Sequence, residues 1–223
     1  MPQGRSVQVH DTTARALLAA GALAGPVFTL AWLLEGATRA DYDPLRHPVS
    51  SLAIGEWGWT QSAAFLVTGL LTLAYAFGLQ RRLRSLEGPV WGPRLIAAIA
   101  VGLLGAGLFI TDPMNGYPPG TPPLPLQYSV PGRLHRLFSA LVFLGLPAAC
   151  FVFGRFFTRR GARRWANYSV VTGVAFLALF VVTSAGFAQV PGLVDYAGLF
   201  QRLTLTVGWA WLTLLALWLM RSA

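Results

Sequence analysis

Side chains that could do chemistry gather at the edges of long apolar stretches in this sequence of 223 residues. Asp43 and His47 lie before the second stretch. Asp112 ends the third stretch, and His135 begins the fourth. Carboxylates and imidazoles are common general acids and bases in enzymes. We therefore take these four residues as the candidate catalytic residues.

Three of the four could instead bind a metal ion. Two imidazoles and one carboxylate with an open coordination position would suit a catalytic zinc ion. On this reading His47, Asp112 and His135 are the metal ligands, and a divalent metal is the expected cofactor. The three residues come from separate segments and lack the HExxH spacing of helical zinc sites. Only the fold could bring them together.

Ser50, Arg136 and Arg202 are the candidate ligand-binding residues at the same edges. If the last spanning helix begins near Gly198, Arg202 lies about one turn into it, where an ionisable residue usually faces the bundle interior and has a partner. Asp112 should seek a cation, because a carboxylate at a helix C-terminus is not stabilised by the helix dipole, and Arg133, Arg136 or Arg202 could supply it. The alternatives for Arg202 are a contact with a ligand or an extension to the membrane interface. Ser50 could also simply begin a short helix.

The composition of the chain is that of a membrane protein. Hydrophobic residues make up 55% of it and charged residues only 11%, whereas soluble domains carry roughly 25% charged residues. A hydrocarbon core about 30 Å thick needs roughly 20 apolar residues in a helix. Six uncharged stretches meet this need, at approximately Ala16–Leu34, Ser62–Leu79, Leu95–Thr111, Leu137–Phe153, Tyr168–Ala188 and Leu203–Met220. We expect an all-α fold, an integral membrane six-helix bundle, with one six-span domain over residues 15–223 after a cytoplasmic tail at residues 1–14.

The arginines predict the orientation of this bundle. All 17 basic residues are arginine, and twelve of them lie on the side of the two termini. Basic residues concentrate in cytoplasmic loops, so we expect both termini to be cytoplasmic. The candidate residues then face outward. The high net charge of +9 reflects this topology, so we expect membrane lipids as partners and no nucleic acid. The lack of lysine excludes Schiff-base chemistry.

Four segments at the ends of the spans resemble a known family. They are YDPLRHPVSSLAIGEWGW, FITDPMNG, GRLHRLFSALVF and GLFQRLTLTVGW. In these segments, and over nearly the whole chain, the sequence resembles bacterial membrane proteins of the "domain of unknown function 998" family. The resemblance implies a six-helix protein of the bacterial inner (plasma) membrane, without a settled reaction. The family-like positions in this sequence are Asp43, His47, Ser50, Asp112, His135 and Arg202.

These residues lead us to expect an outward-facing polar pocket that binds or processes an amphipathic molecule, either a lipid or an isoprenoid. Two enzymatic alternatives remain open. One is a metal-dependent lipid hydrolase with histidine and aspartate ligands. The other is a membrane-embedded prenyl cyclase, in which Asp43 or Asp112 would protonate an alkene and aromatic faces would stabilise the cation. The sequence leaves open whether the protein is an enzyme.

Overall fold

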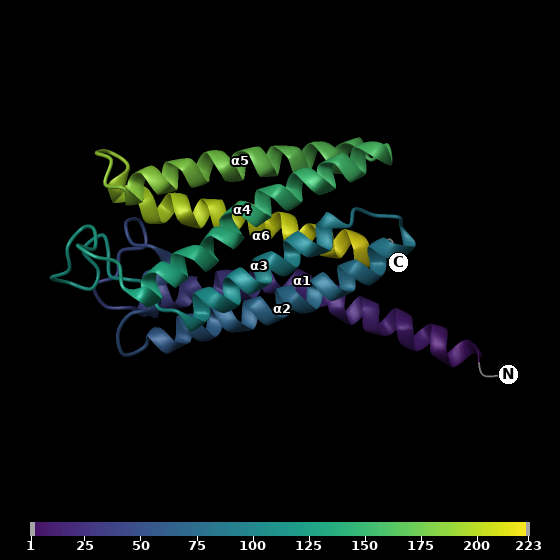
Figure 1. The fold of residues 1–223 in the computed structure, drawn as a ribbon, viewed down its shortest axis with the longest axis horizontal. Helices are drawn as coiled ribbons and strands as arrows, with labels where there is room; N and C mark the ends of the chain where they lie inside the picture. Colours follow the sequence, from purple (N-terminus) through teal and green to yellow (C-terminus); the bar gives the residue numbers. More distant parts are fainter. Residues whose placement is uncertain (1–2, 222–223) are drawn as a thin grey trace.

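The computed structural model describes residues 3–221, and it describes side chains from residue 13 onward. Over that range the chain forms six long helices joined by loops (Figure 1). The helices are α1 (Gln3–Thr38), α2 (Gly58–Ser85), α3 (Trp91–Leu108), α4 (Val130–Arg159), α5 (Arg163–Phe187) and α6 (Ala197–Arg221). Two short 3₁₀ helices, η1 (Val49–Ala53) and η2 (Val194–Tyr196), lie in the loops. Each long helix is apolar enough to cross a membrane, which confirms the expected all-α six-span fold.

The helices extend beyond the apolar stretches that revealed them. The sequence predicted the fourth span at Leu137–Phe153, whereas α4 has 30 residues. Hydropathy marks only the part of a helix that fits the hydrocarbon core, and polar turns continue the same helix into the interface. α4 ends where Gly161 adopts a positive φ of 70°, in the short turn into α5. α1 similarly begins at Gln3, before the first apolar stretch.

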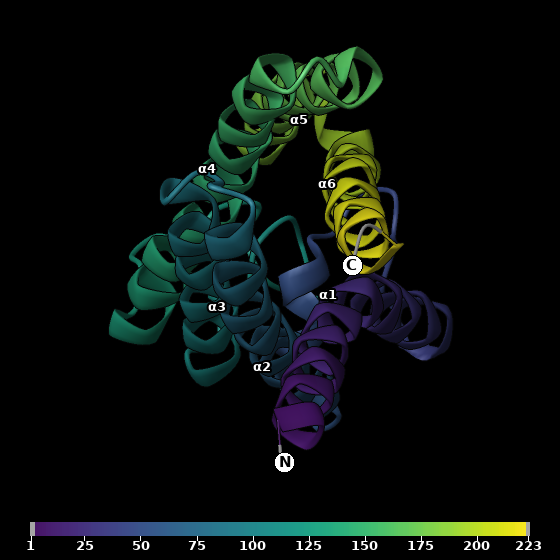
Figure 2. The same cartoon turned by 90° about the vertical axis from the view of Figure 1, so that its right-hand side faces the viewer.

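The six helices form a closed ring (Figure 2). Each helix packs against the next one in the chain, and α6 packs against α1. Two glycines of α1 permit this close approach. A Cβ on Gly21 would collide with the ring of Tyr75 in α2, and a Cβ on Gly25 would lie 3.0 Å from the Cβ of Trp209 in α6. The small residues of α1 are therefore used for packing within the chain.

The two ends of the helix bundle differ in the loops that connect the helices (Figure 1). One end, which we call the loop end, carries the long segments 39–57 and 109–129 and the shorter segment 188–196. The other end carries the turns at 86–90 and 160–162. All of the candidate site residues lie at or near the loop end. Which end faces the cytoplasm stays a prediction from the arginine distribution.

Candidate functional site

Asp43 and His47 close a local turn of the chain. The backbone N–H of Asp43 donates to Nδ1 of His47 at 2.8 Å, and the backbone N–H of His47 donates to the Asp43 carbonyl at 2.8 Å. The Asp43 carboxylate accepts the N–H of Leu45 at 2.9 Å, as aspartates in turns often do. Both side chains therefore shape residues 42–48, which we call the loop turn.

The His47 ring is enclosed by this turn and by the next loop. It lies between the rings of Tyr42 and Tyr117, with centroid distances of 5.5 and 5.2 Å, and it hydrogen-bonds to the backbone of Asn115. Burial lowers the pKa of His47, although the nearby Asp43 carboxylate opposes this shift. The imidazole is therefore neutral at pH 7 and has partners within the loops.

Arg202 of α6 binds the loop turn through neutral acceptors. Its Nη1 donates to the carbonyls of Pro44 at 2.6 Å and His47 at 3.1 Å. Its Nη2 donates to the hydroxyl of Tyr42 at 2.5 Å. Neither of the two ion pairs among the described residues involves Arg202 or Asp112. The expected Arg202–Asp112 pair is therefore wrong, because the loop turn supplies enough oxygen atoms to satisfy a guanidinium group with five donors.

Tyr42 completes the binding of Arg202. Burial raises the pKa of Tyr42 to about 12, although the charge of Arg202 opposes this shift. The phenol consequently keeps its proton and donates it to the Pro48 carbonyl at 2.9 Å. The guanidinium of Arg202 also lies 5.3 Å from the ring of Trp32 in α1. A buried cation is thus stabilised by hydrogen bonds and by aromatic faces.

The loop turn packs against the first turn of α6. The backbone N–H of Leu199 donates to the Leu45 carbonyl at 2.9 Å. A Cβ on Gly198 would lie 2.5 Å from the His47 carbonyl oxygen and 2.7 Å from that of Pro44. Only glycine therefore allows these carbonyls to approach the helix and reach Arg202, one turn further along.

α6 also caps the short helix η1. The Oε1 atom of Gln201 accepts the N–H of Val49 at 2.8 Å, and both groups are buried. Pro48 precedes η1 and offers no side-chain acceptor. Gln201 therefore satisfies the first free N–H of η1, although it lies 152 residues further along the chain. The sequence suggested Ser50 for this role, but Ser50 does not perform it.

Asp112 lies after the end of α3, but its carboxylate binds the start of α4. Its carboxylate accepts the backbone N–H of Ser129 at 3.2 Å. Ser129 is the N-cap of α4, and its hydroxyl accepts the N–H of Gly132 at 3.0 Å. A carboxylate at a helix N-terminus is stabilised by the helix dipole. The negative charge of Asp112 is thus accounted for without a cation.

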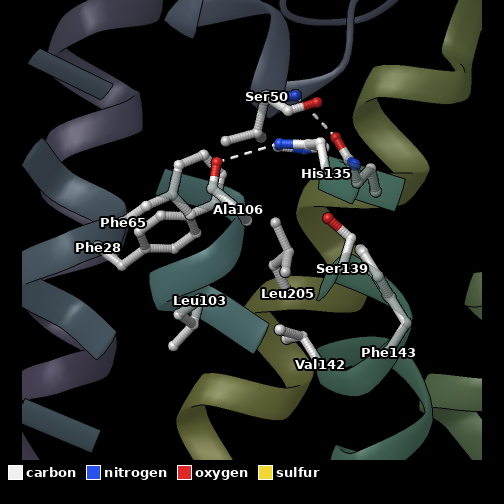
Figure 3. Close-up of a pocket in the computed structure, with 12 residues that line it drawn as sticks. Phe28, Ser50, Phe65, Leu103, Ala106, His135, Ser139, Val142, Phe143 and Leu205 are labelled. Carbon is white, nitrogen blue, oxygen red and sulfur yellow. Dashed lines mark hydrogen bonds between the residues drawn. The ribbon is translucent and has the colours of Figure 1, made fainter. Parts of the chain in front are cut away.

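His135 binds the free end of α3. Its Nδ1 lies 2.8 Å from the Phe109 carbonyl and 3.1 Å from the Ala106 carbonyl. The last carbonyls of a helix have no partner within the helix, so Nδ1–H donates to them. In a neutral imidazole the other nitrogen, Nε2, is then a hydrogen-bond acceptor. Figure 3 shows His135 and Ser139 beside a pocket between the helices.

The expected metal site does not form. Across the part of the chain whose side chains are described, no three His, Cys, Asp or Glu residues are arranged to hold a metal ion. His47 belongs to the loop turn, whereas Asp112 and His135 line a separate groove. The three residues serve three different helix and loop ends, which is why they do not converge.

That groove lies at the loop end, between α4 and α5. The two helices meet at the 160–162 turn and diverge toward the loops (Figure 1), and the groove between them has a volume of about 460 Å³. We call it the side groove. Its polar lining residues are Ser50, Thr111, Asp112, Tyr128, His135, Arg136, Ser139, Ser184 and Gln201. Its apolar lining includes Leu124, Ala140, Phe143, Phe180 and Phe187.

A smaller pocket of about 40 Å³ shares part of this lining and extends toward the centre of the ring (Figure 3). The residues common to both are Ser50, His135, Ser139, Phe143 and Gln201. Of the seven candidate residues, four line the side groove: Ser50, Asp112, His135 and Arg136. Of the other three, Asp43 and His47 belong to the loop turn, and Arg202 of α6 binds it.

Several residues at these two places were not among the candidates. Ser139 and Ser184 line the side groove, while Tyr42 and Gly198 hold Arg202 and the loop turn. One signal was present in the sequence for two of them. Ser139 follows His135 by four residues and Gly198 precedes Arg202 by four, so each pair shares a helix face.

Comparison with known proteins identifies the family of the chain. The model of the family described as "Protein of unknown function (DUF998)" matches residues 22–218. The match covers far more than half of the sequence, so the chain belongs to this family. No curated protein and no solved structure matches the chain significantly.

Proposed function

We propose that this membrane protein of the DUF998 family binds one amphipathic lipid or isoprenoid molecule in the side groove. The observation that carries the proposal is the arrangement of the groove itself. Polar groups lie near the loops, and phenyl rings lie further along α4 and α5. An amphipathic molecule has the same division into a polar head and an apolar chain. Pockets lined mostly by apolar side chains with a few polar groups are typical of small-molecule sites.

The polar end of the groove offers groups that the protein itself does not use. The hydroxyl of Ser139 makes no hydrogen bond to any other described residue. The Nδ1 of His135 is occupied, which leaves Nε2 as an acceptor. Arg136 is exposed, and its guanidinium lies 4.2 Å from the Tyr128 ring centroid. These groups could bind a head group that carries both hydroxyl and acidic oxygens.

The apolar end fits a hydrocarbon chain. Phe143 of α4 and Phe180 of α5 stack with a centroid distance of 4.8 Å and an interplanar angle of 15°. Phe143 lies eight residues beyond His135, which corresponds to about 12 Å along a helix. The groove opens between two membrane-spanning helices, so a chain could enter from the hydrocarbon region without passing through water. The arginine distribution supports an outward orientation of the groove, and the plasma-membrane location is the one that the family resemblance implies.

Binding explains this groove better than the enzymatic alternatives do. A metal-dependent hydrolase needs a ligand cluster, and the described side chains do not gather one. A prenyl cyclase needs an acid free to protonate an alkene. Asp43 closes the loop turn, and Asp112 accepts a hydrogen bond at the start of α4. Both carboxylates are therefore engaged in structural roles.

The proposal can be tested by photolabelling in nanodiscs. We would use two probes, a diazirine-bearing phospholipid and a diazirine-bearing isoprenyl alcohol, and map the labelled peptides by mass spectrometry. We expect at least one probe to label Phe143, Phe180 and their neighbours above all other lipid-facing positions. Ser184→Trp places a large ring in the groove and should remove this labelling, because Ser184 lines the groove and its side chain is exposed.

The matched control is Val181→Trp. Val181 lies on α5 one turn from Ser184, is 65% exposed, and is not part of the groove lining. This variant should label as the wild type does. Even labelling along all lipid-facing helices, or labelling unaffected by Ser184→Trp, would show that the groove does not select an amphipathic molecule.

A further inference from the structure

The end opposite the loops carries a second groove. It lies between the turn at 86–90 and the last turns of α4, and its volume is about 630 Å³. Three arginines line it, Arg155, Arg159 and Arg160, together with a single carboxylate, Glu87. We call it the arginine groove. It shares no lining residue with the side groove.

One of these arginines holds the groove together. The guanidinium of Arg160 donates a hydrogen bond to the carbonyl of Leu86, and it lies 4.9 Å from the ring centroid of Phe156. It therefore connects the end of α4 to the α2–α3 turn. The distance between the two walls of the groove is fixed by this contact.

The other two arginines have no such role. Arg155 and Arg159 are exposed, and neither forms a hydrogen bond or ion pair through its side chain with another described residue. They lie four residues apart, so both project from the same face of α4. Two like charges at this spacing repel each other. An anion between them would remove this repulsion and could accept hydrogen bonds from both guanidinium groups.

The remaining wall of the groove is apolar. Trp91 begins α3 and is 62% exposed, and Val90 and Val152 lie beside it in the lining. Exposed tryptophan at the end of a spanning helix is typical of the membrane interface. Val152 lies one turn before Phe156 on α4, toward the hydrocarbon core. A molecule in the groove would thus meet charge at one end and apolar side chains at the other.

We propose that the arginine groove binds the phosphate of one anionic phospholipid. Arg155 and Arg159 would contact the phosphate, and the acyl chains would lie along Val152 toward the membrane interior. Basic pockets between spanning helices at the cytoplasmic surface are suited to such head groups. Glu87 would repel the anion, but it is one carboxylate against three guanidinium groups. The apolar wall favours a membrane lipid over free phosphate, which has no apolar part.

The test is native mass spectrometry of the full chain released from micelles. Dioleoyl phosphatidylglycerol is compared with dioleoyl phosphatidylcholine, and inorganic phosphate is added in a separate arm. We expect the wild type to retain one phosphatidylglycerol more tightly than phosphatidylcholine. The double variant Arg155→Gln/Arg159→Gln should weaken that binding by about 25-fold, if each guanidinium contributes about fivefold near an anionic lipid.

The matched control is Arg163→Gln/Arg164→Gln. It removes the same charge at the same end of the molecule, from residues that do not line the groove, and it should keep the preference for phosphatidylglycerol. A second variant, Arg155→Lys/Arg159→Lys, keeps the charge and should lose only part of the affinity, because lysine cannot bind phosphate in bidentate fashion.

Three outcomes would overturn the proposal. Equal retention of the two lipids by the wild type would show that the groove does not select an anion. Unchanged phosphatidylglycerol binding in the Arg→Gln double variant would place the lipid elsewhere. Displacement of phosphatidylglycerol by inorganic phosphate at equal concentration would show that the groove binds free phosphate, with no contribution from the lipid chains.

Discussion

The loop turn and the side groove lie at the same end of the molecule and use similar residues in opposite ways. Each combines a histidine with an arginine near the end of a spanning helix. At the loop turn, Arg202 of α6 donates to the carbonyls of Pro44, His47 and Gly198 and to one phenol. In the side groove, Ser139 has no partner among the described residues. A polar residue at the end of a span is therefore a candidate for ligand binding only where the fold leaves its hydrogen-bonding groups unused.

The loop turn is further tied to the other two loops. Arg46 forms an ion pair with Asp195 at 2.5 Å, and its Nε donates to the Asn115 carbonyl at 3.2 Å. The Nε2 of Gln189 donates to the side chain of Asn115 at 2.6 Å. Residues from all three loops thus form one hydrogen-bonded network. This network gives the loop end a fixed shape on one side of the bundle.

The largest expected effect is from Arg202→Ala. The change leaves the carbonyls of Pro44 and His47 and the hydroxyl of Tyr42 without their donor. We expect the free energy of unfolding to fall by about 2–4 kcal/mol, because each buried unpaired group costs about 1–3 kcal/mol and part of the site will hydrate. Thermal unfolding in detergent measures the loss.

Two control variants sharpen this prediction. Arg133→Ala removes an exposed arginine at the same end of the bundle and should change stability by less than about 0.5 kcal/mol. Arg202→Lys keeps the charge but loses the planar fork, so it should lie between the wild type and Arg202→Ala. If Arg202→Ala melts like Arg133→Ala, Arg202 does not hold the loop turn.

A smaller effect is expected from lowering the pH. The folded-state pKa of His47 lies below its ordinary value of 6.5 because the ring is buried. Below about pH 6.5, His47 binds a proton more readily in the unfolded chain than in the folded chain. The free energy of unfolding therefore decreases as the pH falls below this value, and His47 does not affect it at higher pH. We expect a loss of a few degrees in melting temperature between pH 7 and pH 5, where about 1 kcal/mol corresponds to 2–4 °C.

The comparison that isolates His47 is the variant His47→Gln. Asp43, Arg46 and Arg202 surround the ring and influence its protonation, and they remain in the variant. The difference between wild type and variant should therefore report His47 alone. If both proteins show the same pH dependence, the loop turn does not depend on a neutral imidazole.

The smallest effect on stability is expected from Ser139→Ala. Because the Ser139 hydroxyl has no partner in the described part of the protein, its removal should change the free energy of unfolding by less than about 0.5 kcal/mol. Photolabelling of the side groove should nevertheless decrease. A clear loss of stability would mean that Ser139 belongs with Arg202 as a structural residue, and the contrast between the two regions would fail.

Hydropathy alone predicts the fold, because a spanning helix must be about 20 residues long and apolar. The six helices follow directly from the six stretches, and only their ends differ. The candidate site residues lie at or near the loop end, and the prediction that this end faces outward rests on the arginines alone. Asp112, His135, Arg136 and Ser50 line the side groove.

The partners of these residues could not be predicted, for a physical reason. Backbone carbonyls are present at every position, so the sequence does not indicate which of them will accept from an arginine. Charged side chains are few, so the sequence suggests that opposite charges pair with one another. The sequence therefore offers Arg202 as one of three arginines for Asp112, although Arg202 binds backbone carbonyls that a turn brings together. Asp112 was treated as the end of α3, although its charge stabilises the start of α4. In both cases the partner depends on how a loop folds back, which no periodicity in the sequence reveals.

The binding of the loop turn to α6 has a consequence for biosynthesis. Pro44 and Arg202 are 158 residues apart, and α6 leaves the ribosome after the other five described helices. Until it inserts, the loop turn has no guanidinium donor, η1 lacks its cap, and the ring stays open between α1 and α5. Insertion of α6 thus closes the ring and supplies the hydrogen-bond partners of the loop turn and of η1. A chain that stops short of Gly198 would leave these polar groups unpaired at the loop end, and incompletely folded chains are in general removed by cellular proteases.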